Sequence, residues 1–407
     1  MGKDTVTPET VKASPEKWLL ADHIAKMSTS IIREILKISS QPGVISLAGG
    51  YPSPDMFPLE DLKKAAIDAI DEFQSAATQY SFSLGIPQLR QTVADRETRL
   101  GVDTKIDNIL ITSGSQQGID IVGRAFLQKG DYIVTENPTY VGALQAFNYY
   151  QPRYAPVEMD RQGMLVDRVE EAIKKYKPKM VYTVSTFQNP TGVTMTVERK
   201  RALVELCVKY NVPLVDDNPY GEIRFAGEHV PTMKEVGGDA VISLGTFSKL
   251  IAPGLRIAWM NAAASIIPVF EKVKQGTDLH ANTFTQYMIY KYIQSGKFED
   301  HIRELIKNYG DKRNLMLEEM DEHFPEGITW TRPEGGLFLW VELPEGMSAT
   351  RLIDKAVEEK VTYVYGQPFF PDGSGENTFR LNFSNASHDQ IIQAIRRLGR
   401  VFRENMP

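Results

Sequence analysis

The sequence lacks the features that are typical of disulfide-bonded, membrane-spanning and secreted proteins. It holds one cysteine, Cys207, so an intrachain disulfide is impossible, and we expect this residue to fill buried apolar space in a helix. No run of 18 apolar residues occurs, which excludes a helical membrane span. The first residues show no apolar stretch typical of a secretory signal, and Val6 stands where a myristoylation motif needs Ser or Thr. We therefore expect a cytoplasmic protein.

An excess of positive charge is also missing. The chain has 46 Lys and Arg against 52 Asp and Glu, a net charge of −6, which gives no support to nucleic-acid binding. The six histidines are scattered, and none has the spacing of metal ligands, so we assign no metal site.

The middle of the chain alternates short apolar runs with helical patterns. Strands are expected at 108–112, 132–135, 153–157, 180–184, 212–215, 240–244 and 255–260. Helices are expected at 117–127, 140–149, 166–175 and 197–210. This alternation predicts an α/β fold with a mainly parallel central sheet flanked by helices and right-handed crossovers.

The pattern changes after residue 295. Helices are expected at 298–323, 349–360 and 388–404, with strands at 337–343, 361–365 and 378–383. These elements predict a smaller α+β domain. We expect residues 1–60 to form an N-terminal arm and part of the small domain, 61–295 the large domain, and 296–407 the small C-terminal domain.

The segment VISLGTFSKLIAPGLRIAWM, residues 241–260, carries the most informative residue, Lys249. A lysine amine can attack a carbonyl carbon and form an imine. The hydroxyls of Thr246 and Ser248 and the guanidinium of Arg256 can bind a phosphate beside it. A carbonyl compound that carries a phosphate describes pyridoxal phosphate. The alternative is a lysine that faces solvent at a strand end.

A second anion-binding motif, TSGSQQG, follows the first strand of the middle region. Gly114 permits a tight turn, and the free amides of Ser115 and Gln116 at a helix start would point at an anion. The alternative is a plain helix cap by Ser113 or Ser115.

Three further strand ends carry polar or aromatic side chains. Tyr140 could stack on a flat ring, and Asn189, held extended before a proline, aims its amide at the crevice. Asp217 could pair with a protonated pyridine nitrogen, while Tyr220 could donate its hydroxyl to a ring oxygen. The alternatives are a core aromatic, a common Asn-Pro turn and a helix cap by Asp217.

Taken in order, these motifs resemble the fold-type I pyridoxal phosphate aminotransferases of class I/II. The motifs are SLAGGYPSPDMFP, QYSFSLGIPQLR, TSGSQQG, NPTY, FQNPTG, DDNPY, TFSKLIAPGLR and FRLNFS. The resemblance runs from about residue 18 to the end and is strongest to the α-aminoadipate/kynurenine (LysN-like) aminotransferases. It implies an aspartate aminotransferase-like large domain, a homodimer, and ping-pong transfer of an amino group to 2-oxoglutarate.

The resemblance implies a role for each predicted cofactor residue. Lys249 binds the cofactor and shuttles a proton, Asp217 pairs with the ring nitrogen, and Tyr140 stacks on the ring. The ring oxygen is bonded by Asn189 and Tyr220. The phosphate is held by Ser115, Gln116, Thr246, Ser248 and Arg256, and Tyr80 reaches it from the neighbouring subunit.

The substrate residues are implied in the same way. Arg380, with Asn189, grips the α-carboxylate, and Gly50 and Tyr51 line the side-chain pocket. Arg33 contacts a distal carboxylate, unless it is simply a solvated helix arginine. Position 51 is tyrosine where relatives often carry leucine, so aminoadipate, aromatic and branched-chain donors all stay open.

Two other functions compete with amino transfer. A lyase or decarboxylase could use the same cofactor site, because the chemistry depends on which substrate bond stands perpendicular to the ring. A transcription regulator with an aminotransferase-like sensor domain would need a helix-turn-helix, and fewer than 50 residues precede SLAGG.

Overall fold

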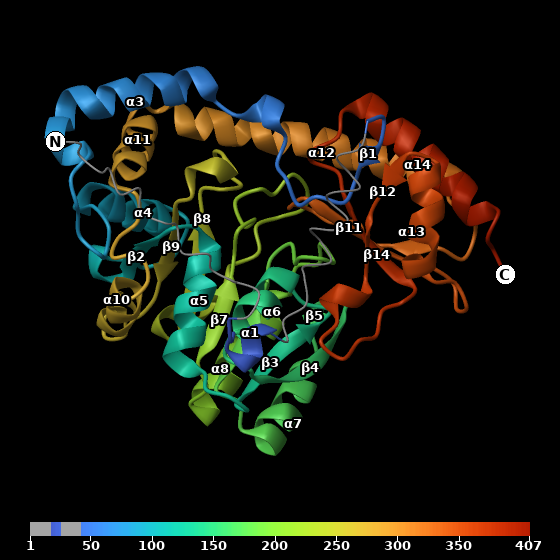
Figure 1. Ribbon diagram of the computed structural model, residues 1–407, viewed down its shortest axis with the longest axis horizontal. Coiled ribbons are helices and arrows are strands. Elements are labelled where there is room, and N and C mark those ends of the chain that lie inside the picture. The colour runs from blue at the N-terminus through green and yellow to red at the C-terminus, as the bar shows by residue number, and fades with distance from the viewer. Residues whose placement is uncertain (1–17, 26–41) are drawn as a thin grey trace, which may run out of the picture.

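The computed structural model describes residues 18–25 and 42–407. Figure 1 shows a large sheet with helices on both faces, a smaller sheet with its own helices on the right, and the long helix α12 (Lys297–His323) along the top. None of the helices in the described ranges is both long and apolar enough to cross a bilayer.

The large sheet has eight strands in the order β2-β9-β8-β7-β6-β3-β4-β5. Their bounds are β2 (Ile109–Thr112), β9 (Ala258–Asn261), β8 (Val241–Thr246), β7 (Leu214–Asp217), β6 (Met180–Thr183), β3 (Tyr132–Asn137), β4 (Arg153–Asp160) and β5 (Gly163–Met164). The pairs from β8 to β4 are parallel. The predicted α/β class with a mainly parallel sheet is therefore confirmed.

Strand β9 departs from the parallel pattern, because it pairs antiparallel with both β8 and β2. The connection from β8 to β9 spans only residues 247–257, which is too short for the crossover that a parallel pair needs. This short connection contains Lys249, so the chain reverses direction at the residue that the sequence singled out.

Alternate residues of the central strands pack on opposite faces of the sheet, as the period of two requires. Ile133 and Val215 belong to one apolar cluster, and Val134 and Leu214 belong to the other. The first face carries α5 (Ser115–Phe126), α6 (Val141–Asn148) and α10 (Ile267–Gln275). The second carries α7 (Val166–Tyr176), α8 (Val197–Tyr210) and α9 (Met233–Gly237). Cys207 lies buried in α8, within the second cluster.

The smaller sheet is antiparallel, in the order β10-β11-β14-β13. Its strands are β10 (Thr329–Trp330), β11 (Phe338–Glu342), β14 (Thr378–Asn382) and β13 (Val364–Tyr365). Two residues near the start of the described chain, β1 (Ile45–Ser46), pair in parallel with β12 (Val361–Thr362). This pairing brings the segment that follows β1 beside the small sheet, and the division into domains stays a prediction.

The remaining helices complete the two halves. They are α1 (Asp22–Ala25), α3 (Leu59–Phe73), α4 (Pro87–Arg99), α11 (Thr283–Gln294), α13 (Ala349–Glu358) and α14 (His388–Arg403). One continuous apolar cluster joins α3, α4, α11 and α12 to the small sheet, α13 and α14. Buried apolar packing therefore couples the two halves of the molecule.

Candidate active site

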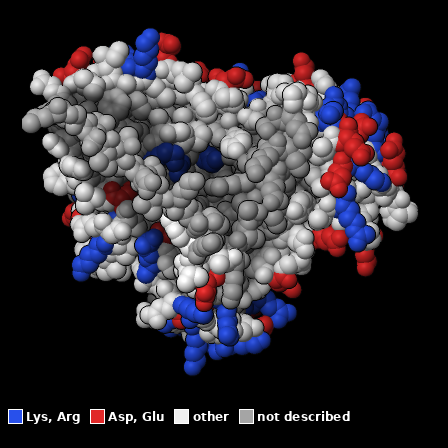
Figure 2. Space-filling model, in the orientation of Figure 1, with Lys and Arg blue, Asp and Glu red and all other residues white. Residues whose placement is uncertain are grey.

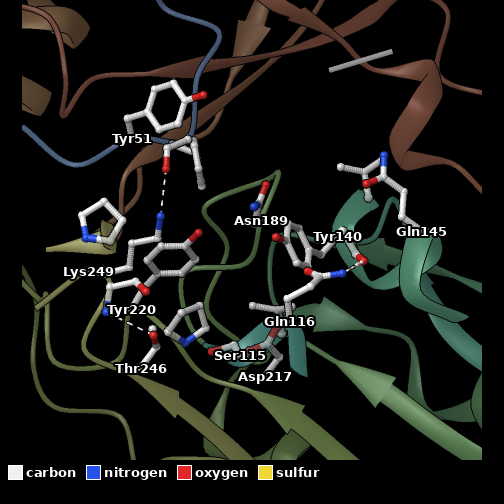
Figure 3. A pocket seen from close by; sticks show the side chains of 18 of the residues that line it. Tyr51, Ser115, Gln116, Tyr140, Gln145, Asn189, Asp217, Tyr220, Thr246 and Lys249 are labelled. Atoms are coloured by element: carbon white, nitrogen blue, oxygen red, sulfur yellow. Dashed lines mark hydrogen bonds between the residues drawn. The ribbon is translucent and has the colours of Figure 1, made fainter. Parts of the chain in front are cut away.

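A cavity of about 390 Å³ lies at the carboxyl ends of the parallel strands, between the large and small sheets. In Figure 2, positively charged side chains are visible inside a hollow of the face shown. The predicted site residues that line the cavity are Gly50, Tyr51, Ser115, Gln116, Tyr140, Asn189, Asp217, Tyr220, Thr246, Ser248, Lys249, Arg256 and Arg380. Figure 3 shows how their side chains converge.

Lys249 extends its amine into the cavity from the β8–β9 connection. Its Nζ donates a hydrogen bond to the Gly50 carbonyl at 2.8 Å. Burial, and then the nearby charges of Arg380 and Arg256, lower the pKa of Lys249 to about 8, although Asp217 acts in the opposite direction. An amine with this pKa is partly neutral near pH 7, which is the form that attacks a carbonyl.

Asp217 is the last residue of β7 and is almost fully buried. Its Oδ2 accepts a hydrogen bond from the Tyr182 hydroxyl at 2.9 Å, whereas no described residue bonds to its buried Oδ1. Burial raises the pKa of Asp217 to about 7. Its place inside a strand shows that it is not a helix cap.

Two tyrosines and an asparagine stand around the same space. Burial, followed by the charge of Asp217, raises the pKa of Tyr140 to about 12. Burial also raises the pKa of Tyr220, although a hydrogen bond with Asn189 opposes the shift. Both phenols therefore stay protonated near neutral pH and can act as hydrogen-bond donors.

The start of α5 and the turn after β8 form an anion cradle. Gly114 precedes the helix with φ +91°, and a Cβ atom there would lie 2.2 Å from Arg256 Nη2. Ser115 is therefore the first helical residue rather than a cap, and no described residue bonds to its buried hydroxyl. The Ser248 amide donates to Thr246 Oγ1 at 3.1 Å, which sets the turn opposite Arg256.

The small sheet supplies the buried guanidinium of Arg380, on β14. Its Nη1 donates to Asn189 Oδ1 and its Nη2 to the Ala48 carbonyl, both at 2.8 Å. The guanidinium also lies over the rings of Phe338 and Phe369, at 4.2 and 5.1 Å. Burial lowers the pKa of Arg380 to about 10, so the group stays cationic at neutral pH.

Two predicted residues are not placed in the cavity. Tyr80 lies outside the described lining, is 80% exposed, and packs edge-on against His280 at 5.8 Å. Arg33 lies outside the described residues. Tyr51 lines the cavity but is half exposed, at its mouth.

The sequence did not single out some of the residues that line the cavity. They are Val141, Gly142, Gln145, Val184, Pro219, Pro253 and Phe338. A helical signal could have found three of them, because Val141, Gly142 and Gln145 follow Tyr140 within the first turns of α6.

The residues of the cavity fit pyridoxal phosphate. The orphaned Oδ1 of Asp217 can accept a hydrogen bond from a cationic ring nitrogen. At another side of the cavity, the orphaned Ser115 hydroxyl, the start of α5 and Arg256 suit a phosphate. A Cβ at position 114 would fill the space of this cradle, which explains the glycine.

Comparison with known proteins bears on the same site. The family "Aminotransferase class I and II" matches residues 42–398. The chain belongs to this family. The predicted family and enzyme class are therefore confirmed.

Relatives of this aminotransferase are similar over almost their whole length. An aromatic-amino-acid aminotransferase of Thermococcus litoralis is 42% identical, over 93% of each chain. Kynurenine aminotransferase of Pyrococcus horikoshii, solved with PMP, is 42% identical with a TM-score of 0.92, over 95% of this chain and 98% of its own. LysN, the α-aminoadipate aminotransferase of Thermus thermophilus, was solved with N-(5'-phosphopyridoxyl)-L-leucine. It is 35% identical with a TM-score of 0.88, over 95% of this chain and 97% of its own.

Proposed function

We propose that this aminotransferase uses pyridoxal phosphate to move the amino group of an L-amino acid to 2-oxoglutarate. The donor is an aminoadipate, aromatic or branched-chain amino acid, and the two half-reactions follow each other in ping-pong order. The observation that carries this proposal is the convergence of the Lys249 amine, the orphaned Asp217 oxygen and the anion cradle in one cavity. The adducts bound by Pyrococcus kynurenine aminotransferase and by LysN support the choice of cofactor.

The cofactor, when bound, supplies an aldehyde for a lysine amine and a ring that withdraws electrons from the substrate Cα. Asp217 would keep a proton on the ring nitrogen, and Tyr140 would stack on the ring. Asn189 and Tyr220 would bond the ring oxygen. Ser115, Gln116, Thr246, Ser248 and Arg256 would hold the phosphate.

Lys249 carries the proton during the reaction. With a pKa lowered to about 8, its Nζ can exchange protons near neutral pH, so it would accept one from the substrate Cα and pass it on to a second carbon, as amino transfer requires. The Gly50 carbonyl, 2.8 Å away, holds the amine at this side of the cavity.

Substrate recognition combines one fixed contact with a variable pocket. Arg380 binds the α-carboxylate through a two-pronged contact, together with Asn189, and Gly50 and Tyr51 line the side-chain space. Among the described lining residues, the cations are Lys249, Arg256 and Arg380. A dicarboxylate donor would therefore need a further cation, and we propose Arg33 for that role.

The active unit that we propose is a homodimer in which Tyr80 of each copy reaches the phosphate of the other. The exposure of Tyr80 supports this assembly, because a large aromatic residue in contact with a partner would be buried only in the dimer. On the basis of the composition of the chain, we propose that the protein is cytoplasmic.

A donor panel tests the proposed function. Purified protein loaded with pyridoxal phosphate is mixed with 2-oxoglutarate and each of aminoadipate, kynurenine, aromatic and branched-chain donors, and the new 2-oxo acid is measured. We expect the wild-type enzyme to transfer the amino group of at least one donor, and we expect Lys249→Ala to transfer none. Ammonia or carbon dioxide released without a 2-oxo acid acceptor would instead indicate a lyase or a decarboxylase.

A further inference from the structure

A buried glutamate lies behind the cavity, without lining it. Glu136, on β3, is fully buried, and burial raises the pKa of its carboxyl group to about 7. Its carboxylate accepts hydrogen bonds from Thr183 Oγ1 at 2.5 Å, the Val184 amide at 3.2 Å and Gln188 Nε2 at 3.0 Å. The N–H groups of Val184 and Gln188 can only donate, so Glu136 accepts a hydrogen bond from each of them.

Further hydrogen bonds of Gln188 link Glu136 to two loops of the site. Its Nε2 also donates to the Pro138 carbonyl at 2.9 Å, two residues before Tyr140. Its Oε1 accepts from the Thr191 amide at 2.8 Å and the Thr191 hydroxyl at 2.7 Å. The Gln188 carboxamide has two N–H donors and two acceptor lone pairs, and these hydrogen bonds use all four. Because the N–H side must face Glu136, the carboxylate fixes the orientation of the amide.

The next residue in the chain, Asn189, faces the cavity (Figure 3). Its Oδ1 accepts from Arg380 Nη1 at 2.8 Å. Among the described residues, the other acceptor of that guanidinium is the Ala48 carbonyl. Asn189 thus sets one of the two contacts that orient Arg380, and a fork-shaped group must be oriented to meet a carboxylate with both prongs.

We propose that Glu136 is a positioning residue for the α-carboxylate of the substrate. Through Gln188 it fixes Asn189, and through Asn189 it fixes the plane of the Arg380 guanidinium. This inference rests on the proposed function of the cavity. A displacement of about 1 Å in such a contact can cost on the order of 100-fold in rate, so a buried group that holds Asn189 and Arg380 in place would have a large effect on the reaction.

Three substitutions separate positioning from general stability. Glu136→Leu removes the acceptor, and Gln188→Leu cuts the link while Thr183 and Val184 keep their bonds to Glu136. Glu136→Gln is the conservative variant, because its amide oxygen still accepts from Gln188 and its amide nitrogen can donate to Thr183. Tyr363→Phe is the matched control, since it removes a buried hydrogen bond of 2.7 Å to the Ala349 carbonyl, away from the site.

The kinetic test compares two amino donors on the loaded enzyme. One is the fastest amino acid of the donor panel, and the other is the amine that lacks its carboxyl group. We expect Glu136→Leu and Gln188→Leu to slow the amino acid on the order of 100-fold in single turnover and the amine by less than about threefold. Glu136→Gln should stay within about threefold for both, and Tyr363→Phe should change only the thermal midpoint. Equal losses for amino acid and amine would overturn the proposal.

A crystal structure of the loaded Gln188→Leu enzyme gives a second readout that needs no substrate. We expect the Asn189 amide to turn and its 2.8 Å contact with Arg380 Nη1 to be lost. An unchanged contact would overturn the proposal. If the wild-type enzyme used no donor at all, the proposed function would fail, and this structural comparison would still show whether Gln188 orients Asn189 and Arg380.

Discussion

At the scale of single residues, burial shifts the two central titratable groups of the cavity in opposite directions. It lowers the pKa of Lys249 to about 8 and raises the pKa of Asp217 to about 7, since the charged form of each group loses its water. The two side chains therefore change charge within a narrow range of pH. A ring with a cationic nitrogen and a carbonyl carbon would stabilise the charged carboxylate and use the neutral amine.

Replacement of Lys249 by methionine should change how the stability of the cofactor-free protein depends on pH. The pKa of the amine is about 8 in the folded chain and 10.5 in the reference state, so the unfolded chain binds more protons between these values. Stability must then rise with pH across that window in the wild type, by at most about 3 kcal/mol more than in Lys249→Met. Urea unfolding midpoints from pH 7 to 11 measure this difference, with the exposed Lys129→Met as control. Parallel curves for wild type and Lys249→Met would contradict it.

Replacement of Asp217 by alanine should lower kcat on the order of 100-fold and leave KM for the donor nearly unchanged. The reason is that, in the proposed mechanism, the carboxylate stabilises charge that develops only in the transition state. Steady-state kinetics measure the effect. Tyr182→Phe is the control, because it removes the 2.9 Å hydrogen bond but keeps the carboxylate, and it should cost about tenfold or less. A similar kcat for Asp217→Ala and wild type would remove Asp217 from the mechanism.

At the scale of elements, the first turn of α5 depends on a glycine that no other residue could replace without movement. Gly114 and Gly130 both have a positive φ, +91° and +88°. A Cβ at position 114 would meet Arg256, whereas none of the described atoms lies within 4 Å of one at position 130. The two glycines therefore separate backbone strain from the loss of the anion cradle.

Gly114→Ala and Gly130→Ala should each lose about 1 kcal/mol of stability, because alanine is strained at positive φ. Only Gly114→Ala should weaken cofactor binding, by about tenfold or more, since its methyl group displaces the guanidinium of Arg256. Thermal unfolding and a fluorescence titration with pyridoxal phosphate measure the two effects. Equal affinity in the two variants would show that Arg256 does not hold the phosphate.

The sequence predicted the elements of the large sheet well where apolar periodicity was clean. Helix α8 was expected at 197–210 and is observed at Val197–Tyr210. Helix α4 was not predicted, because two arginines face inward and break its apolar pattern. Arg90 donates to the Ile109 carbonyl, and Arg96 pairs with Glu222.

The candidate site was predicted less evenly. The sequence places Asp217 after its strand, but Asp217 is the last residue of β7, because it pairs with Leu244 of β8. Glu136 received no role from the sequence. Its partners Thr183 and Gln188 lie 47 and 52 residues away, so only the parallel pairing of β3 with β6 brings them together. Contacts of this range leave no local signal in a single sequence.

At the scale of the whole molecule, the position of Tyr80 bears on assembly. In one chain its side chain is 80% exposed and lies outside the described lining of the cavity. Phe82 beside it is 66% exposed. Two exposed aromatic residues so close together are typical of a surface that another protein chain covers.

In the proposed homodimer, Tyr80→Phe should leave the dimer intact but weaken its binding of pyridoxal phosphate by about tenfold, because the phosphate would lose one hydrogen bond from the other subunit. Sedimentation velocity measures the assembly, and cofactor titration measures the affinity. Tyr149→Phe, a half-exposed tyrosine after α6, is the control. A monomer with wild-type affinity at every protein concentration would refute the role of Tyr80.

The single thiol of the chain can report when helix α8 leaves the sheet. Cys207 is 2% exposed beneath the sheet, and burial raises the pKa of its thiol to about 12, so the reactive thiolate is scarce while α8 stays docked. Alkylation by a maleimide dye then requires that α8 leave the sheet. Each labelled molecule carries a single dye, and when alkylation is faster than reclosure, the rate of labelling equals the rate of opening.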